Sequence, residues 1–190
     1  KSQYHPHFLF NALNTVYFQI DESNKAPRRT LEMISELLRY QLYGGNQKVS
    51  ILQEIDYLKT YIALRKLRMS ERLRLRVEFP PELNELNIYP LLFLPLVENA
   101  FKYVGGDYQL DIIMKWENNR ISLFIRNSIP ELSAEDEALR KSVDERQRKG
   151  IGLVNLRRRL SLLYPNKHRL ETRKEETEFV AELMIEIEDI

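Results

Sequence analysis

Near the start of the chain, the residues best suited to take part in a chemical reaction are His7 and Asn11. Read as a helix, positions 3 to 14 place polar side chains on one face: Gln3, His7, Asn11 and Asn14. The opposite side carries an apolar stripe: Leu9, Leu13, Val16 and Ile20. We therefore expect His7 to project into solvent, with Asn11 one turn away. A neutral imidazole has a free lone pair near pH 7 and can act as a nucleophile, although an ordinary surface histidine is the alternative.

A second group of candidate residues is Glu98, Asn99 and Lys102, which fall within about one helical turn. The Asn99 carbonyl is a hard oxygen ligand suited to Mg²⁺, Lys102 can neutralise phosphate, and Glu98 can orient or deprotonate an attacking group. The combination suits a nucleotide–metal site. Taken alone it is a weak signal, because Glu and Lys four positions apart are more often a pair on a helix surface.

Two glycines, Gly150 and Gly152, open the helical pattern of the last third of the chain. Glycines at this place let the backbone approach phosphates, and a helix N-terminus offers free amides to an anion. The same pair could also be a tight turn without a ligand. The preceding segment, 130–149, is long and polar and ends at the glycines, so we expect a mobile lid.

The elements that must position these residues begin with a helical hairpin. Helices are predicted to about Ile20 and from about Arg28 to Tyr43, with a turn over 21–27 and a stop at 44–46. Each helix is amphipathic, and one hairpin alone buries both stripes poorly. A second copy that completes a four-helix bundle is the expected remedy.

From about Val49 the composition shifts and strands appear. A helix is predicted over 51–68, and strict alternation predicts half-buried strands over 72–79, 108–116, 121–125 and 179–187. Helices over 90–103 and 152–164 would cover the apolar faces, with the run 157–159 mostly outward. We therefore predict an α+β chain: a helical hairpin over 1–48 that dimerises, then a two-layer α/β sandwich over 49–190.

Composition sets broad limits on function. The chain has 190 residues, 43% of them hydrophobic and 30% charged, which fits a globular protein with a real core. A net charge of +1 favours neither nucleic acid nor membrane, and the absence of cysteine excludes disulfides and thiolate metal sites. Because the chain begins at Lys1 rather than Met, we expect a fragment. A metal site built on His5 and His7 is disfavoured, since the two rings diverge on a helix.

Taken together, these segments resemble the sensor histidine kinases of the LytS (autolysis regulator) type. In that family a phosphoacceptor box precedes an ATP-binding domain of the gyrase/Hsp90/histidine kinase/MutL (GHKL) class. The run Pro6–Asn14 is close to verbatim for the box. Further segments fit in the family's order: 38–40, Tyr61 with Arg68, 95–100 and 150–153.

The resemblance implies autophosphorylation of His7 by ATP with Mg²⁺, followed by transfer to an aspartate on a response regulator. It implies a homodimer, no nucleic-acid partner, and the cytoplasmic portion of a membrane sensor whose spans lie outside this sequence. The implied catalytic residues are His7, Glu98 and Asn11. The implied nucleotide-binding residues are Asn99 (also the metal ligand), Lys102, Tyr103, Asn127, Gly150, Gly152 and Leu153.

Several positions depart from the family pattern. Where Asp-x-Gly-x-Gly is frequent, the chain reads 127–131 as Asn-Ser-Ile-Pro-Glu. Asn127 keeps a carbonyl oxygen that could accept the adenine amino proton, but the charge and both glycines are missing. Tyr103 and His5 also replace commoner residues, and no carboxylate directly follows His7. Asn11 is a candidate for positioning a hydrolytic water. The alternative function is a non-catalytic dimeric signalling scaffold with impaired ATP binding.

Overall fold

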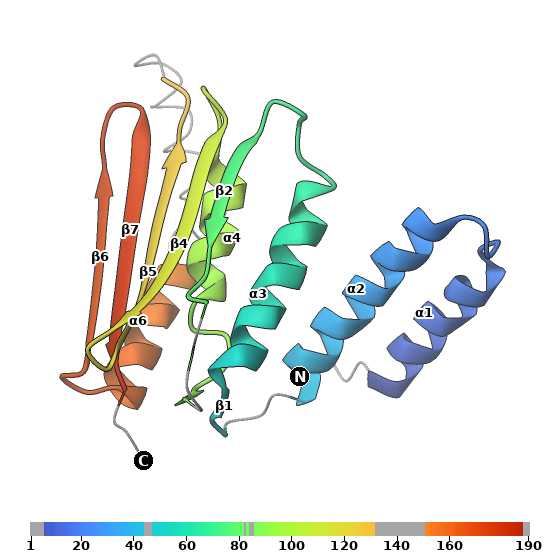
Figure 1. Ribbon diagram of the computed structural model, residues 1–190, viewed down its shortest axis with the longest axis horizontal. Coiled ribbons are helices and arrows are strands. Elements are labelled where there is room, and N and C mark those ends of the chain that lie inside the picture. Colours follow the sequence, from blue (N-terminus) through green and yellow to red (C-terminus); the bar gives the residue numbers. More distant parts are fainter. Residues whose placement is uncertain (1–5, 44–46, 82, 84–85, 132–150, 188–190) are drawn as a thin grey trace.

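The computed structural model describes residues 6–43, 47–81, 83, 86–131 and 151–187. It confirms an α+β architecture in which helices cover one face of a mixed β-sheet (Figure 1). The helices are α1 (Pro6–Gln19), α2 (Lys25–Tyr43), α3 (Ile51–Lys66), α4 (Leu94–Tyr103) and α6 (Ile151–Leu163). The strands are β1 (Val49–Ser50), β2 (Arg74–Glu78), β3 (Asn87–Ile88), β4 (Gln109–Glu117), β5 (Arg120–Ser128), β6 (His168–Lys174) and β7 (Glu178–Glu186).

The main sheet has the strand order β2-β4-β5-β7-β6, with β2 parallel to β4 and the other neighbours antiparallel. Alternate residues of the central strands point to the helices and are buried there, as Ile112, Ile125 and Ala181 show across β4, β5 and β7. This is the half-buried alternation expected from the sequence. The remaining residues, many of them charged, lie on the face that the helices leave uncovered (Figure 1).

Three strands, β1, β3 and β6, were not predicted from the sequence. β6 pairs along one edge of the sheet with β7, and Leu170 is its buried residue among polar and charged neighbours. An edge strand of this kind carries charge that blocks further pairing, so its apolar signal is weak. β3 has only two residues, which pair with β1.

Two helices begin at other residues than predicted. α2 begins at Lys25, so Pro27 lies in its first turn, where a missing amide costs little. α4 begins at Leu94 rather than at Pro90, with a proline at its start. Leu91, three residues before α4, has φ of 59°, a left-handed conformation that interrupts any helix.

The helical hairpin is held together at its turn and along its length. The Arg28 guanidinium donates to the Ile20 carbonyl at 3.1 and 3.0 Å, and the Tyr17 hydroxyl donates to Glu32 at 3.1 Å. No side chain of α1 is buried, and Phe8 and Phe18 are 73% and 78% exposed. The hairpin therefore leaves apolar surface open along α1. Among the described residues, none of the helices combines the length and apolar character needed to cross a membrane.

Helix α2 is joined to α3 by stacked and hydrogen-bonded side chains. The rings of Tyr40 and Tyr57 lie 4.7 Å apart at an interplanar angle of 28°. The Tyr40 hydroxyl donates to Glu54 Oε2 at 2.6 Å, and Gln41 Nε2 donates to the Tyr57 hydroxyl at 2.7 Å. Leu37 of α2 also belongs to the same core as the sandwich. The hairpin is thus packed onto the first helix of the sandwich.

Glu54 is fully buried in this junction, with a side chain that is 0% exposed. Its Oε2 also accepts a hydrogen bond from the Leu91 amide at 3.0 Å. Burial raises the pKa of Glu54, against the opposing effect of the donors that stabilise the carboxylate. A carboxyl group inside the core is therefore the least expected feature of a helix whose other inward residues are mainly apolar.

We predict that Glu54→Gln becomes more stable relative to the wild type as pH rises. A raised folded-state pKa stabilises the fold below the ordinary value of 4.5, and this contribution is lost as pH rises through the folded-state pKa. Glutamine does not titrate, so it escapes that loss. The measurement is the denaturation midpoint of both proteins from pH 4 to 8, with exposed Glu117→Gln as control. A difference that does not change with pH would contradict the expectation.

Candidate functional site

The phosphoacceptor candidate His7 lies in the first turn of α1 and is exposed. Asn11 Nδ2 lies 3.2 Å from His7 Nδ1, across one helical turn. The predicted juxtaposition of these side chains is present. When the Asn11 amide donates this hydrogen bond, the proton of the neutral ring sits on Nε2 and Nδ1 acts as the acceptor. The ring then has a fixed orientation on the helix surface without help from a carboxylate.

The second candidate group lies on α4. Leu94, Val97 and Phe101 are buried, as expected for its inner face. Glu98 and Lys102 are exposed and Asn99 is half-buried. The Lys102 ammonium lies 5.0 Å from the centroid of the Tyr103 ring, and this contact keeps it at the C-terminal end of the helix. The helix therefore presents a carboxylate, an amide and an ammonium away from the sheet.

Glu98 faces helix α3. Partial burial raises its pKa, and the nearby Arg65 guanidinium opposes that rise. Arg65 also lies over the Phe101 ring, 5.7 Å from its centroid. A carboxylate with a raised pKa is a better proton acceptor than a fully solvated one, which is a property that favours a general base.

Asn127 lies on the inner face of β5 and is 1% exposed. Its Nδ2 donates to the Ser128 carbonyl at 3.3 Å, whereas its Oδ1 is buried with no hydrogen-bond partner. A buried acceptor without a donor lowers the stability of the fold. This oxygen is therefore suited to accept a hydrogen bond from an N–H group of a ligand.

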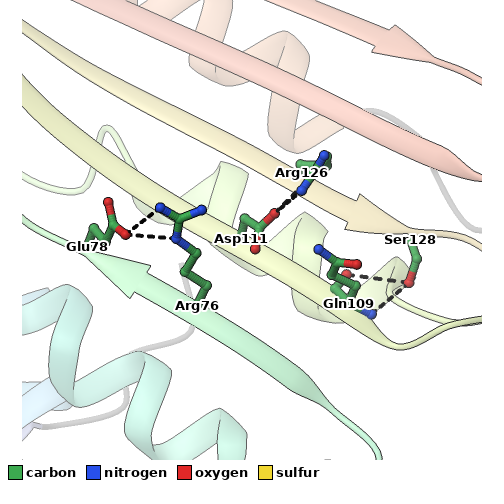
Figure 2. A network of polar contacts seen from close by, with 6 residues as sticks. All are labelled: Arg76, Glu78, Gln109, Asp111, Arg126 and Ser128. Atoms are coloured by element: carbon green, nitrogen blue, oxygen red, sulfur yellow. Dashed lines mark hydrogen bonds and ion pairs between the residues drawn. The ribbon is translucent and has the colours of Figure 1, made fainter.

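Ser128 ties the end of β5 to the turn after α4. Its hydroxyl donates to the Gly105 carbonyl at 2.6 Å and accepts from the Gln109 amide at 2.9 Å. Figure 2 shows Ser128 beside Gln109, with the pairs Asp111–Arg126 and Arg76–Glu78 along the neighbouring strands. The end of α4 and the position of Asn127 are therefore fixed relative to each other.

The segment after Asn127, where the sequence lacks the expected glycines, packs against the turn that follows α4. A Cβ atom at Gly105 would lie 2.9 Å from Pro130 Cδ, and Gly106 has φ of +60° beside the Ile129 carbonyl. The Ile129–Pro130 backbone therefore packs closely on this glycine pair.

The third candidate group is described only in part. Gly152 is exposed in the first turn of α6, and a Cβ atom there would meet nothing within 4 Å. Space alone therefore does not require glycine at this position. Leu153 is half-buried. Gly150 and the expected lid, apart from Pro130 and Glu131, lie outside the described residues.

The arginines 157–159 on α6 were expected to point mostly outward. Arg157 and Arg158 are exposed, but the run is not wholly outward. Arg159 is half-buried, and its guanidinium donates to the Pro90 carbonyl at 3.0 Å and approaches the Leu91 carbonyl at 3.5 Å. Arg157 donates to the Leu170 carbonyl at 2.9 Å. These arginines therefore fasten α6 to neighbouring backbone rather than meeting only solvent.

The structure brings some candidates together and keeps others apart. Asn99, Asn127 and Gly152 come from α4, β5 and α6, which adjoin on the covered side of the sheet. His7 lies on α1, which packs on α2, on the far side of α3 from these elements (Figure 1). Within the described ranges, no cluster of three or more His, Cys, Asp or Glu side chains could hold a metal ion.

Glu54 and Arg65 were not predicted as site residues. The signal for Glu54 was present, because it falls at helical spacing with Ile51, Ile55 and Leu58 on the apolar face of α3. Arg65 gave no such signal, since charged residues near a helix C-terminus are ordinary.

Comparison with known proteins gives three kinds of finding. A family model described as histidine kinase matches residues 1–73. The sensor protein kinase HptS of Staphylococcus aureus strain USA300 is 29% identical over 173 residues, which cover 88% of this chain and 33% of HptS. The chain thus spans about one third of the length of the curated relatives it matches.

Solved structures show the same kind of fold at low identity. Full-length ShkA in complex with AMPPNP is 14% identical, with a TM-score of 0.50 over 96% of this chain and 44% of that one. The Acinetobacter baumannii histidine kinase AdeS is 13% identical, with a TM-score of 0.47 over 97% and 96%. The chain is therefore similar to histidine kinases in its first 73 residues, and similar in fold to a solved histidine kinase.

Proposed function

We propose that this chain is the kinase core of a LytS-type sensor histidine kinase, which phosphorylates itself on His7 and passes the phosphoryl group to an aspartate of a response regulator. The observation that carries the proposal is the exposed His7 imidazole, oriented by Asn11, inside the segment that matches the histidine kinase family model. The division of labour follows the two parts of the chain: residues 1–48 accept the phosphoryl group and dimerise, and residues 49–190 bind ATP.

The nucleotide would be held by residues from α4, β5 and α6. The unpartnered Asn127 Oδ1 fits the adenine amino group, because that group supplies the N–H that the buried oxygen lacks. Asn99 would coordinate Mg²⁺ together with phosphate oxygens, and Lys102 and the backbone of 150–153 would meet the phosphates. Mg²⁺, when bound, neutralises charge on the phosphates. Tyr103 and Leu153 border the same region.

The chemistry asks little of the protein beyond positioning. A ring nitrogen of His7 attacks the γ-phosphorus of ATP, the bond to the β-phosphate oxygen breaks, and ADP leaves. The proton lost from the imidazole passes to Glu98, whose pKa is raised by partial burial. Holding the two reactants in line supplies most of the acceleration.

His7 and the nucleotide site must approach each other for this step. Because α1 lies beyond α2 and α3, either the hairpin swings relative to the sandwich or the histidine of a second copy enters the site. The exposed side chains of Phe8, Val16 and Phe18 suit burial against a second hairpin. The active unit in this proposal is therefore a homodimer.

The central prediction is that the chain transfers label from the terminal phosphate of ATP to His7. In the presence of Mg²⁺, the wild type and His168→Gln acquire label that is stable in base and lost in acid. His7→Gln acquires none, since the nucleophile is gone. Absence of label from all three proteins, together with no ATP binding, would favour the non-catalytic scaffold.

A second prediction concerns adenine recognition. Asn127→Leu removes the acceptor at similar volume and should weaken ATP binding about tenfold or more, the usual effect of losing a buried hydrogen bond. Asn127→Asp keeps an acceptor and should bind at least as well as the wild type. Titration calorimetry with ATP and GTP measures both effects. Equal affinities in all three proteins would remove Asn127 from the site.

A third prediction separates two possible roles of Asn11. If Asn11 positions a hydrolytic water, Asn11→Ala should slow dephosphorylation of a cognate regulator about tenfold or more while changing His7 phosphorylation much less. Asn14→Ala, on the same helix face, is the matched control. Equal loss of both activities would show instead that Asn11 acts through the orientation of the His7 ring.

A further inference from the structure

One buried oxygen atom connects the helical hairpin to the nucleotide-binding part of the chain. Glu54 Oε2 accepts from the Tyr40 hydroxyl at 2.6 Å and from the Leu91 amide at 3.0 Å, whereas Oε1 is buried without a hydrogen-bond partner. Tyr40 is on α2, Glu54 is on α3, and Leu91 precedes α4. The carboxylate therefore depends on donors from two separate elements.

The segment that Glu54 holds is strained and is held from two sides. Leu91 has φ of 59°, which is unfavourable for a branched side chain, so its conformation persists only through surrounding contacts. The Leu91 amide donates a hydrogen bond to Glu54, and Arg159 of α6 donates to the carbonyls of Pro90 and Leu91. Helix α4, which carries Glu98 and Asn99, begins three residues later. The orientation of α4 at its start is therefore set by these contacts.

We propose, on the basis of the function proposed above, that Glu54 is a positioning residue that transmits the position of α2 to the nucleotide site. When Tyr40 is in place, Glu54 is held against the Leu91 amide and α4 is fixed. When α2 moves and withdraws the hydroxyl, the buried carboxylate retains only backbone donors from the segment before α4. The states in which Glu54 leaves Leu91 for water or a proton then gain population, because an underpaired buried charge is costly.

The consequence is a coupling between hairpin movement and ATP affinity. The swing that carries His7 towards the nucleotide would at the same time loosen the start of α4, and bound nucleotide would in turn oppose withdrawal of Tyr40. Such coupling is reciprocal for binding equilibria and commonly changes affinity by about fivefold or more. The two stacked rings of Tyr40 and Tyr57 do not by themselves provide it, because Tyr57 bonds to Gln41 and not to the segment before α4.

This last difference supplies a matched pair of variants. Tyr40→Phe and Tyr57→Phe each remove one hydroxyl from the same α2–α3 junction and leave the ring stack intact. Both should lower the denaturation midpoint slightly. Only Tyr40→Phe removes a donor from Glu54, so only this variant should disturb α4.

The first measurement is hydrogen exchange of the full chain without nucleotide. Tyr40→Phe should exchange faster at amides within 89–101, whereas Tyr57→Phe should match the wild type there. The second is ATP binding by calorimetry. Tyr40→Phe should weaken affinity about five- to tenfold, with less than twofold change for Tyr57→Phe.

The outcomes separate this inference from the proposed kinase activity. If the wild type binds ATP and labels His7 but the two variants behave alike in exchange and affinity, Glu54 is a structural residue only and the inference is wrong. Faster exchange in Tyr40→Phe with unchanged ATP affinity also overturns it, since α4 would then move without consequence. If no protein binds ATP, the proposed function fails, and exchange alone reports whether Tyr40 controls the start of α4.

Discussion

The placement of a carboxylate in the interior is the constraint on which much of this structure depends. A buried charge must find donors, and Glu54 finds them in Tyr40 of α2 and in the backbone before α4, with the positive charge of Arg159 nearby. An all-apolar junction could slide or repack with little penalty. A carboxylate with specific donors fixes the hairpin, the first helix of the sandwich and the start of α4 in one arrangement.

The proposed phosphoacceptor and the proposed adenine-binding residue lie in contrasting surroundings. The His7 imidazole is exposed on α1 and is hydrogen-bonded to the neutral Asn11 amide, which suits the proposed encounter with a nucleotide and later a regulator. Asn127 lies inside the sandwich with an acceptor that the protein leaves unused. Solvent exposure at one site and a preformed acceptor at the other fit the proposed reaction, in which positioning provides most of the catalysis.

The departure at 127–131 illustrates how local sequence differences are absorbed. Replacing aspartate by Asn127 removes a charge but keeps the oxygen, and the buried position makes that oxygen more demanding of a partner. Pro130 packs against Gly105, where a Cβ atom would collide with its ring. The two chain segments approach closely because Gly105 has no side chain at this point.

Local periodicity allowed most of the elements to be predicted, because amphipathic helices and alternating strands can be recognised within a few residues. The spacing of His7 and Asn11, the inner face of α4 and the half-buried central strands follow from that pattern. The edge strand β6 and the left-handed Leu91 did not, since the first is masked by charge and the second is imposed by contacts distant in sequence. Tertiary structure alone decided that Glu54 and Arg159 grip the start of α4 and that Asn127 Oδ1 lacks a donor, because hydrogen bonding inside a core depends on which elements meet there.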